Sequence, residues 1–348
     1  MKNILRLILI IFFCGILFGL PSCSDEPEIK TDDYTENVSK EDSVISPSDE
    51  DKTNDGEDTI NPDGSAEEPE SVCPDFYEVI EGNEDDFIFP ALKSPVVTTL
   101  LKDLTIYDEI NHRTWDYNVA LPPSFYEDEE KVYPVLYILH GLGSDNNDAT
   151  YAFRISYLLD YFYEKKLLPE IVVVIPSGER CYWVDDYEEG VEYESFFFNI
   201  FMPQVEETYR IDKTLKRFIT GFSMGGYGAA HYAFTYPEVF GYCYSMSGTL
   251  MGKNTASTPA VPTTIKANIN SSLPYFTMDI GTEDAFLSVN NTVDLLLRVL
   301  EIPHEFIVRE GSHTADFWRS GINACLLRIG RCLDNTLLIE QKFRIYEE

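Results

Sequence analysis

The sequence predicts an α/β fold in which a mostly parallel central sheet carries helices on both of its faces. Beyond Cys73, short runs rich in β-forming residues alternate with longer runs of helical periodicity. Several short runs, such as residues 171–175, are apolar throughout, which is typical of parallel strands covered on both faces. Two strands come first and the alternation follows. Ligand-binding loops are therefore expected after the carboxyl ends of the strands.

The individual elements follow from these patterns. Strands are predicted at residues 101–107, 114–121, 135–139, 171–175, 217–221, 242–247, 275–280 and 305–309. Helices are predicted at residues 151–163, 195–209, 224–236, 290–300 and 315–333. The chain has 348 residues, of which 44% are apolar and 14% aromatic, enough for residues 73–348 to bury the core of one large domain.

The first 22 residues have the pattern of a secretory signal peptide. Lys2 and Arg6 precede an apolar run at positions 7–20, which is shorter than the roughly 20 residues that a membrane-spanning helix needs. The run ends in Leu-Pro-Ser-Cys at positions 20–23, which resembles the lipobox of bacterial lipoproteins and predicts a lipid anchor on Cys23. The alternative is an ordinary cleaved signal in which Cys23 has no role.

Location follows from the same segment. Ser-Asp-Glu-Pro-Glu at positions 24–28 resembles the acidic sorting signals of some Gram-negative surface lipoproteins. We therefore expect an exported lipoprotein at the outer membrane or cell surface, attached to the membrane through Cys23. A periplasmic location is the alternative.

An acidic segment, residues 23–72, separates the signal from the domain. Residues 24–75 hold 19 acidic and 3 basic side chains. Such a segment cannot bury enough apolar area to offset its ordering entropy, so a disordered linker is predicted. The whole chain has a net charge of −34, which argues against a nucleic-acid partner because phosphate binding needs an excess of Lys and Arg.

Cysteine usage indicates no metal site. Five cysteines follow Cys23, and none has metal-binding spacing: Cys73, Cys181, Cys243, Cys325 and Cys332. An exported location permits one or two disulfides, but the sequence does not determine their pairing. No metal or organic cofactor is implied, and the oligomeric state cannot be derived from the sequence.

A Gly-x-Ser-x-Gly motif at residues 221–225 is the strongest chemical signal. It follows a predicted strand and begins a predicted helix, which is the context of a nucleophile elbow centred on Ser223. Side chains at Gly221 and Gly225 would collide with the adjoining strand and helix, so only hydrogen atoms fit there. The alternative is an ordinary glycine-rich turn.

Several stretches resemble the esterase family of α/β-hydrolases, which includes feruloyl and acetylxylan esterases, S-formylglutathione hydrolase, enterobactin esterases and mycolyltransferases. The resemblance extends over residues 101–333 and rests on residues 115–123, 133–141, 221–226 and 281–284, and on Gly311-Ser312-His313 with Phe317-Trp318. It implies the α/β-hydrolase fold and a triad of Ser223, Asp284 and His313. Ala315 departs from the family, which commonly has an aromatic residue at that position.

Chain order leads to the same three residues, because the fold requires the order Ser, acid, His. Asp284 and His313 each follow a predicted strand. Glu283 is the alternative acid, whereas Asp279 lies within a strand. Of the five histidines, only His313 follows a strand after the acid.

Two backbone amides are expected to form an oxyanion hole. One is the N–H of Leu142, in the loop that follows the strand at residues 135–139, and the other is the N–H of Met224, directly after the nucleophile. His140, in the same loop as Leu142, is interpreted as a structural hydrogen-bonding residue rather than the catalytic base.

Aromatic residues after the fourth strand suggest a pocket wall. Tyr182 and Trp183 suit stacking on a sugar face or a phenolic ring, and they are the candidate substrate-binding residues. For residues 196–198 a place in the helix core is favoured. Asp185 and Asp186 could bind Ca²⁺, but two acids without a ligand pattern are weak evidence.

Together these observations favour a serine esterase that removes feruloyl or acetyl groups from plant cell-wall xylan, so its expected partner is a polysaccharide-linked ester. The acyl and alcohol specificity cannot be read from the sequence. A siderophore-ester hydrolase is the nearest alternative. A catalytically inactive, glycan-binding surface lipoprotein is the alternative of a different class, and a mycolyl-type transferase is disfavoured because no long acyl groove is evident.

Overall fold

The computed structural model describes residues 84–88, 90, 96–186, 190–253 and 255–333. The expected signal peptide, the acidic linker, Cys23 and Cys73 lie outside these residues. Within the described ranges, no helix is long and apolar enough to cross a membrane.

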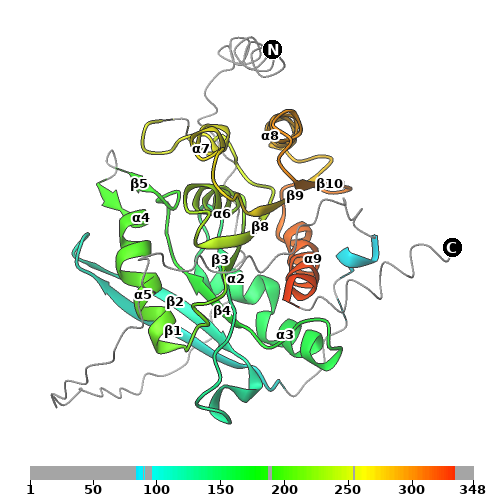
Figure 1. The fold of residues 1–348 in the computed structure, drawn as a ribbon. Coiled ribbons are helices and arrows are strands. Elements are labelled where there is room, and N and C mark those ends of the chain that lie inside the picture. Colours follow the sequence, from blue (N-terminus) through cyan, green and yellow to red (C-terminus); the bar gives the residue numbers. More distant parts are fainter. Residues whose placement is uncertain (1–83, 89, 91–95, 187–189, 254, 334–348) are drawn as a thin grey trace, which may run out of the picture. The chain divides into compact units, whose positions relative to one another are not determined.

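An eight-stranded sheet forms the centre of the fold, in the order β1-β2-β4-β3-β7-β8-β9-β10 (Figure 1). Its first two pairings, β1 with β2 and β2 with β4, are antiparallel, and all the others are parallel. The mostly parallel sheet predicted from the sequence is therefore confirmed. The strands are β1 (Thr99–Asp108), β2 (Arg113–Leu121), β3 (Val135–Leu139), β4 (Val172–Pro176), β7 (Arg217–Phe222), β8 (Phe240–Met246), β9 (Tyr275–Gly281) and β10 (His304–Arg309).

Helices cover both faces of this sheet because its central strands are apolar on both sides. In β3, Val135, Tyr137 and Leu139 belong to one core cluster, whereas Leu136 and Ile138 belong to the other. The first cluster contains residues of α4 (Tyr193–Phe196), α5 (Met202–Thr208), α6 (Met224–Thr235), α7 (Val261–Ala267) and α8 (Leu287–Val299). The second contains residues of α2 (Asn146–Phe153), α3 (Ile155–Glu164) and α9 (Ala315–Leu333).

The helix predicted at residues 151–163 is two helices in the structure. Arg154 has a left-handed backbone (φ 48°), which ends α2 and begins α3. The start of α2 is earlier than predicted because the Asp145 side chain caps it, accepting a hydrogen bond from the Asp148 N–H at 2.8 Å.

The helix predicted at residues 195–209 is interrupted by a π-helical turn, η3 (Phe197–Phe201), between α4 and α5. Pro203 is the second residue of α5, two positions after this turn. Its ring lacks an N–H and would collide with the carbonyl of Asn199 in a regular α-helix, which accounts for the wider turn before it.

Short elements were not predicted, because they contain too few residues to display a period. These are η1 (Glu84–Phe87), η2 (Pro123–Tyr126), the helix α7, and the two-stranded hairpin of β5 (Asp185–Asp186) and β6 (Val191–Glu192).

Candidate active site

Ser223 occupies a sharp turn between β7 and α6. Its backbone angles, φ 55° and ψ −118°, are strained for a residue with a side chain. A Cβ built on Gly221 would lie 2.3 Å from the Gly225 carbonyl oxygen, and one built on Gly225 would lie 2.1 Å from the Leu139 carbonyl oxygen. Only glycine fits at both positions, as the sequence motif predicts.

Hydrogen bonds to neighbouring strands and helices hold this turn. The Ser223 N–H donates to the Met246 carbonyl at 2.9 Å, and the Ser223 carbonyl accepts from the Tyr227 N–H at 3.0 Å. The strained serine is therefore fixed between β8 and the first turn of α6.

Three side chains from separate loops meet at Ser223. The Nε2 atom of His313 lies 2.9 Å from Ser223 Oγ, and its Nδ1 atom lies 2.9 Å from Asp284 Oδ2. The second carboxylate oxygen of Asp284 accepts the Phe286 N–H at 2.9 Å. The arrangement has the geometry of a nucleophile, a base and an orienting acid.

The structure distinguishes Asp284 from Glu283 and Asp279, the two other candidate acids in the sequence. Glu283 is exposed, and Asp279 is buried in β9, where its carboxylate binds Arg309. Burial raises the pKa of the Asp284 carboxyl, but the hydrogen bonds from His313 and the Phe286 N–H lower it more, so the net pKa lies below its usual value. Asp284 is therefore a carboxylate at neutral pH and can hold the His313 Nδ1–H.

Close packing of two loops brings Asp284 to His313. A Cβ on Gly281 would lie 2.3 Å from the Gly311 carbonyl oxygen. That same oxygen accepts the Glu283 N–H at 2.8 Å. The loops after β9 and β10 thus share a backbone contact that a side chain on Gly281 would prevent.

Two aromatic rings pack against the His313 imidazole. Phe286 and Trp318 contact it edge to face, with ring centroids 5.2 and 4.9 Å away. Trp318 in turn stacks on Phe222, the residue before the nucleophile, at 4.7 Å. The sequence reasoning missed the role of Phe286 and Trp318, although the matching of Phe317-Trp318 to the family was a signal for the second.

The two expected oxyanion segments lie beside the turn. Met224 is the first residue of α6, so its N–H has no acceptor within the helix. Leu142 lies in the turn after β3, which the Ser144 N–H closes by donating to the Gly141 carbonyl at 3.2 Å. A Cβ on Gly141 would lie 3.0 Å from the Phe222 ring. The segments of Leu142 and Met224 are thereby packed together, and their role as oxyanion donors stays a prediction.

His140 is a structural residue, as interpreted from the sequence. It is fully buried, its Nε2 atom accepts the Gly178 N–H at 2.9 Å, and its Nδ1 atom lies 2.8 Å from the Gly141 carbonyl oxygen, to which it donates. Burial lowers the pKa of the imidazole to about 4. The side chain therefore links the loops after β3 and β4 in its neutral form.

Because of His140, the free energy of unfolding should fall as the pH is lowered from 6.5 to about 4, by up to about 3 kcal/mol. In this window the unfolded chain binds a proton that the folded imidazole rejects, so acid stabilises the unfolded state. Denaturant titrations across the window should show a smaller acid loss for His140→Asn than for the wild type. His112→Asn, at an exposed histidine, should keep the wild-type loss. Equal losses in all three proteins would contradict this assignment.

Trp183 is not a substrate-binding residue, and that prediction is wrong. Its side chain is fully buried, and Cβ atoms on Gly178 and Gly228 would lie only 2.7 and 2.5 Å from its ring. The indole fills the space that these two glycines leave, so it belongs to the core. Tyr182 is half-buried, with its ring centroid 6.0 Å from that of Tyr227, and its contact with substrate stays a prediction.

The neighbouring residues are structural as well. Phe196 and Phe197 are fully buried, as favoured from the sequence. Asp185 accepts hydrogen bonds from the N–H and hydroxyl of Ser195, and Asp186 pairs with Lys253 at 2.7 Å. Both carboxylates that could bind Ca²⁺ on the sequence pattern thus already have donors within the protein.

Cys181, Cys243 and Cys325 are buried thiols outside any disulfide. Burial raises the pKa of Cys181 and Cys325 to about 12. They are therefore inert as nucleophiles at neutral pH.

Known proteins resemble the chain at the levels of family, sequence and fold. It matches the family described as “Putative esterase” over residues 110–329. Two esterases of Mycobacterium tuberculosis are 33% identical over 136 residues, which is 38% of this chain and 28% of theirs. An acetyl esterase of Caldicellulosiruptor saccharolyticus is 26% identical over 61% of this chain and 74% of its own length. The solved structure of a ferulic acid esterase is 27% identical, with a TM-score of 0.61 over 68% of this chain and 99% of that one.

Proposed function

Since the family match spans residues 110–329, the chain belongs to the esterase family, and we propose that it is a serine esterase that hydrolyses carboxylic esters through an acyl-enzyme. The observation that carries the proposal is the continuous hydrogen-bonded line from Ser223 Oγ through His313 to Asp284, with both contacts at 2.9 Å. A binding module has no physical need to maintain this line beside a strained serine. The geometry therefore favours catalysis over the inactive glycan-binding alternative.

The proposed reaction has two symmetrical halves. His313 Nε2 takes the proton of Ser223 Oγ as that oxygen attacks the ester carbonyl, and the N–H groups of Leu142 and Met224 stabilise the resulting oxyanion. The proton then passes to the departing alkoxide, which leaves as the alcohol. Water repeats the sequence on the acyl-enzyme and releases the acid. Throughout, Asp284 holds the Nδ1–H and stabilises the imidazolium.

For the substrate we propose feruloyl or acetyl esters of cell-wall xylan. The relatives named above support this class: one is an acetyl esterase, and the 27% identical structure is a ferulic acid esterase. The expected lipid anchor at Cys23 and the export signal at residues 1–22 belong to the same proposal, because an exported esterase meets polysaccharides and extracellular esters rather than cytosolic thioesters.

Three substrates compared side by side test this assignment: methyl ferulate, acetylated xylan and a triserine-lactone siderophore. We expect release of ferulate or acetate with a kcat/KM at least roughly tenfold above that for the lactone, since correct polar and apolar contacts are worth a few kcal/mol in the transition state. Preferential opening of the lactone would overturn the xylan proposal. No turnover of any ester, including 4-nitrophenyl acetate, by folded protein would favour the inactive binding module.

A further inference from the structure

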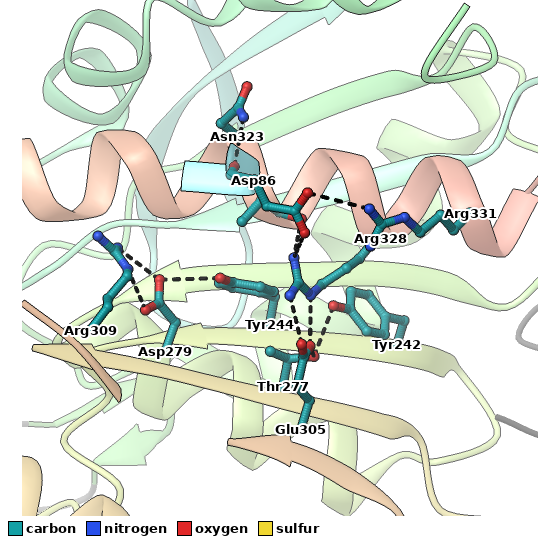
Figure 2. A network of polar contacts seen from close by, with 11 residues as sticks. Asp86, Tyr242, Tyr244, Thr277, Asp279, Glu305, Arg309, Asn323, Arg328 and Arg331 are labelled. Carbon is teal, nitrogen blue, oxygen red and sulfur yellow. Dashed lines mark hydrogen bonds and ion pairs between the residues drawn. The ribbon is translucent and has the colours of Figure 1, made fainter. Parts of the chain in front are cut away.

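A partly buried ion pair joins the strands that lead into the acid and histidine loops. Arg309, at the end of β10, binds both carboxylate oxygens of Asp279 in β9, with Nε–Oδ1 at 2.7 Å and Nη2–Oδ2 at 2.9 Å (Figure 2). In the parallel register Arg309 lies opposite Gly281, three residues before Asp284. The pair therefore lies at the base of both catalytic loops.

Arg309 also reaches the far side of the histidine loop. Its Nη2 atom donates to the Phe317 carbonyl at 2.7 Å, and its Nη1 atom donates to Ser320 Oγ at 2.8 Å, both in the first turns of α9. The guanidinium carbon lies 3.4 Å from the centroid of the Phe317 ring. His313 lies midway in the sequence between Arg309 and Phe317. One side chain thus ties together the two ends of the loop that carries the base.

Stability alone gives little reason for a charged group at this position. Asp279 is fully buried, and burial raises its pKa despite the contact with Arg309. Buried ion pairs can often be replaced by apolar residues at no loss of stability. What a guanidinium offers over an apolar side chain is a rigid planar fork with directed hydrogen bonds. Here those bonds go to β9 and to α9.

We propose that Arg309 is a positioning residue that sets the place of the His313 imidazole between Ser223 and Asp284 by fixing both ends of its loop. The proposal rests on the proposed function, since it concerns the base of that reaction. Arg309 touches no reacting atom and acts through the backbone of the loop. Misplacing a reacting group by about 1 Å can cost up to about 100-fold in rate, so the loop position matters.

A second arginine in the same network, Arg328, supplies a control with the same chemistry. Arg328 of α9 binds both oxygens of Glu305 at 2.6 Å and also contacts Asp86, as Figure 2 shows. Its bidentate pairing resembles that of Arg309, although Arg328 is the more buried of the two, and its bonds go to residues outside the histidine loop. Replacing either arginine with lysine removes the planar, bidentate guanidinium from one ion pair.

The test compares Arg309→Lys with Arg328→Lys in the full chain. We expect Arg309→Lys to lower kcat roughly 10- to 100-fold with KM changed less than about twofold, and to displace the low-field NMR signal of the His313 Nδ1–H. Arg328→Lys should keep kcat within about twofold and leave that signal in place. Equal kcat losses in both variants, or an unmoved signal in Arg309→Lys, would overturn the positioning role.

Two milder substitutions, both at Ser320, keep the proposal testable if Arg309→Lys does not fold. Ser320→Ala removes one anchor of the guanidinium, and Ser320→Thr keeps a hydroxyl there. We expect kcat to fall about threefold in the first and to recover in the second, since the guanidinium loses one of its hydrogen bonds to α9 and regains it with the threonine hydroxyl. Wild-type kcat in Ser320→Ala would contradict the proposal. Turnover that survives Ser223→Ala would refute the triad mechanism itself, a result distinct from either outcome at Arg309.

Discussion

Replacing Ser223 by Ala is expected to lower kcat for ester hydrolysis by about 10³- to 10⁶-fold, because no other group can form the acyl-enzyme. The Ser223 hydroxyl is the atom that His313 Nε2 contacts at 2.9 Å. Substrate binding should persist, since the rest of the site is unchanged. Stopped-flow mixing with 4-nitrophenyl acetate should show a burst of released alcohol in the wild type and none in the variant.

The control for this experiment is a measurement of the variant's folding stability. Alanine at position 223 should relieve strain at φ 55° no better than serine does, so the unfolding midpoint is expected to stay close to that of the wild type. A well-folded Ser223→Ala protein that still turns over ester at a comparable rate would rule out the covalent mechanism.

Replacing Asp284 by Asn is expected to lower kcat by about 10⁴-fold, the loss that such a change causes in a serine-protease triad. The structure gives the physical reason. Oδ1 of Asp284 accepts the Phe286 N–H at 2.9 Å, which orients an Asn amide with its oxygen there and its NH₂ toward His313. That NH₂ would donate to Nδ1 and place the imidazole proton on Nε2, which could then not accept the serine proton.

Glu283→Gln is the matched control, because it makes the same chemical change at the adjacent, exposed acid. We expect its kcat to stay within about twofold of the wild type. The pH dependence of kcat/KM for both variants completes the comparison. If Glu283→Gln lost activity and Asp284→Asn kept it, the orienting acid would be Glu283.

Much of the fold could be predicted because continuous runs of apolar residues indicate strands that are buried on both faces. Residues 135–139 and 315–333 match β3 and α9 residue for residue. The elements that escaped prediction depend on single residues or on length. A left-handed backbone at Arg154 splits one helix, Pro203 imposes a π-helical turn on another, and α7 is only seven residues long. Periodicity cannot reveal such features.

The residues of the candidate site likewise divide into those that sequence patterns identify and those whose role only the structure reveals. Ser223, Asp284 and His313 could be chosen by motif and chain order, and the structure brings all three together. Trp183 was misjudged because an aromatic residue in a loop looks the same in sequence whether it lines a pocket or fills a space. Only the packing against Gly178 and Gly228 separates the two cases. The positioning role proposed for Arg309 likewise depends on contacts that no sequence pattern indicates.

The chemical identity of the enzyme intermediate tests the central claim most directly. Rapid quenching after mixing with a slowly hydrolysed ester, followed by peptide mass spectrometry, should find the acyl group on Ser223 at up to one per chain. The adduct should disappear once substrate is exhausted, as water completes the cycle. Sustained ester hydrolysis with residue 223 unmodified, or with the acyl group on another side chain, would contradict the account.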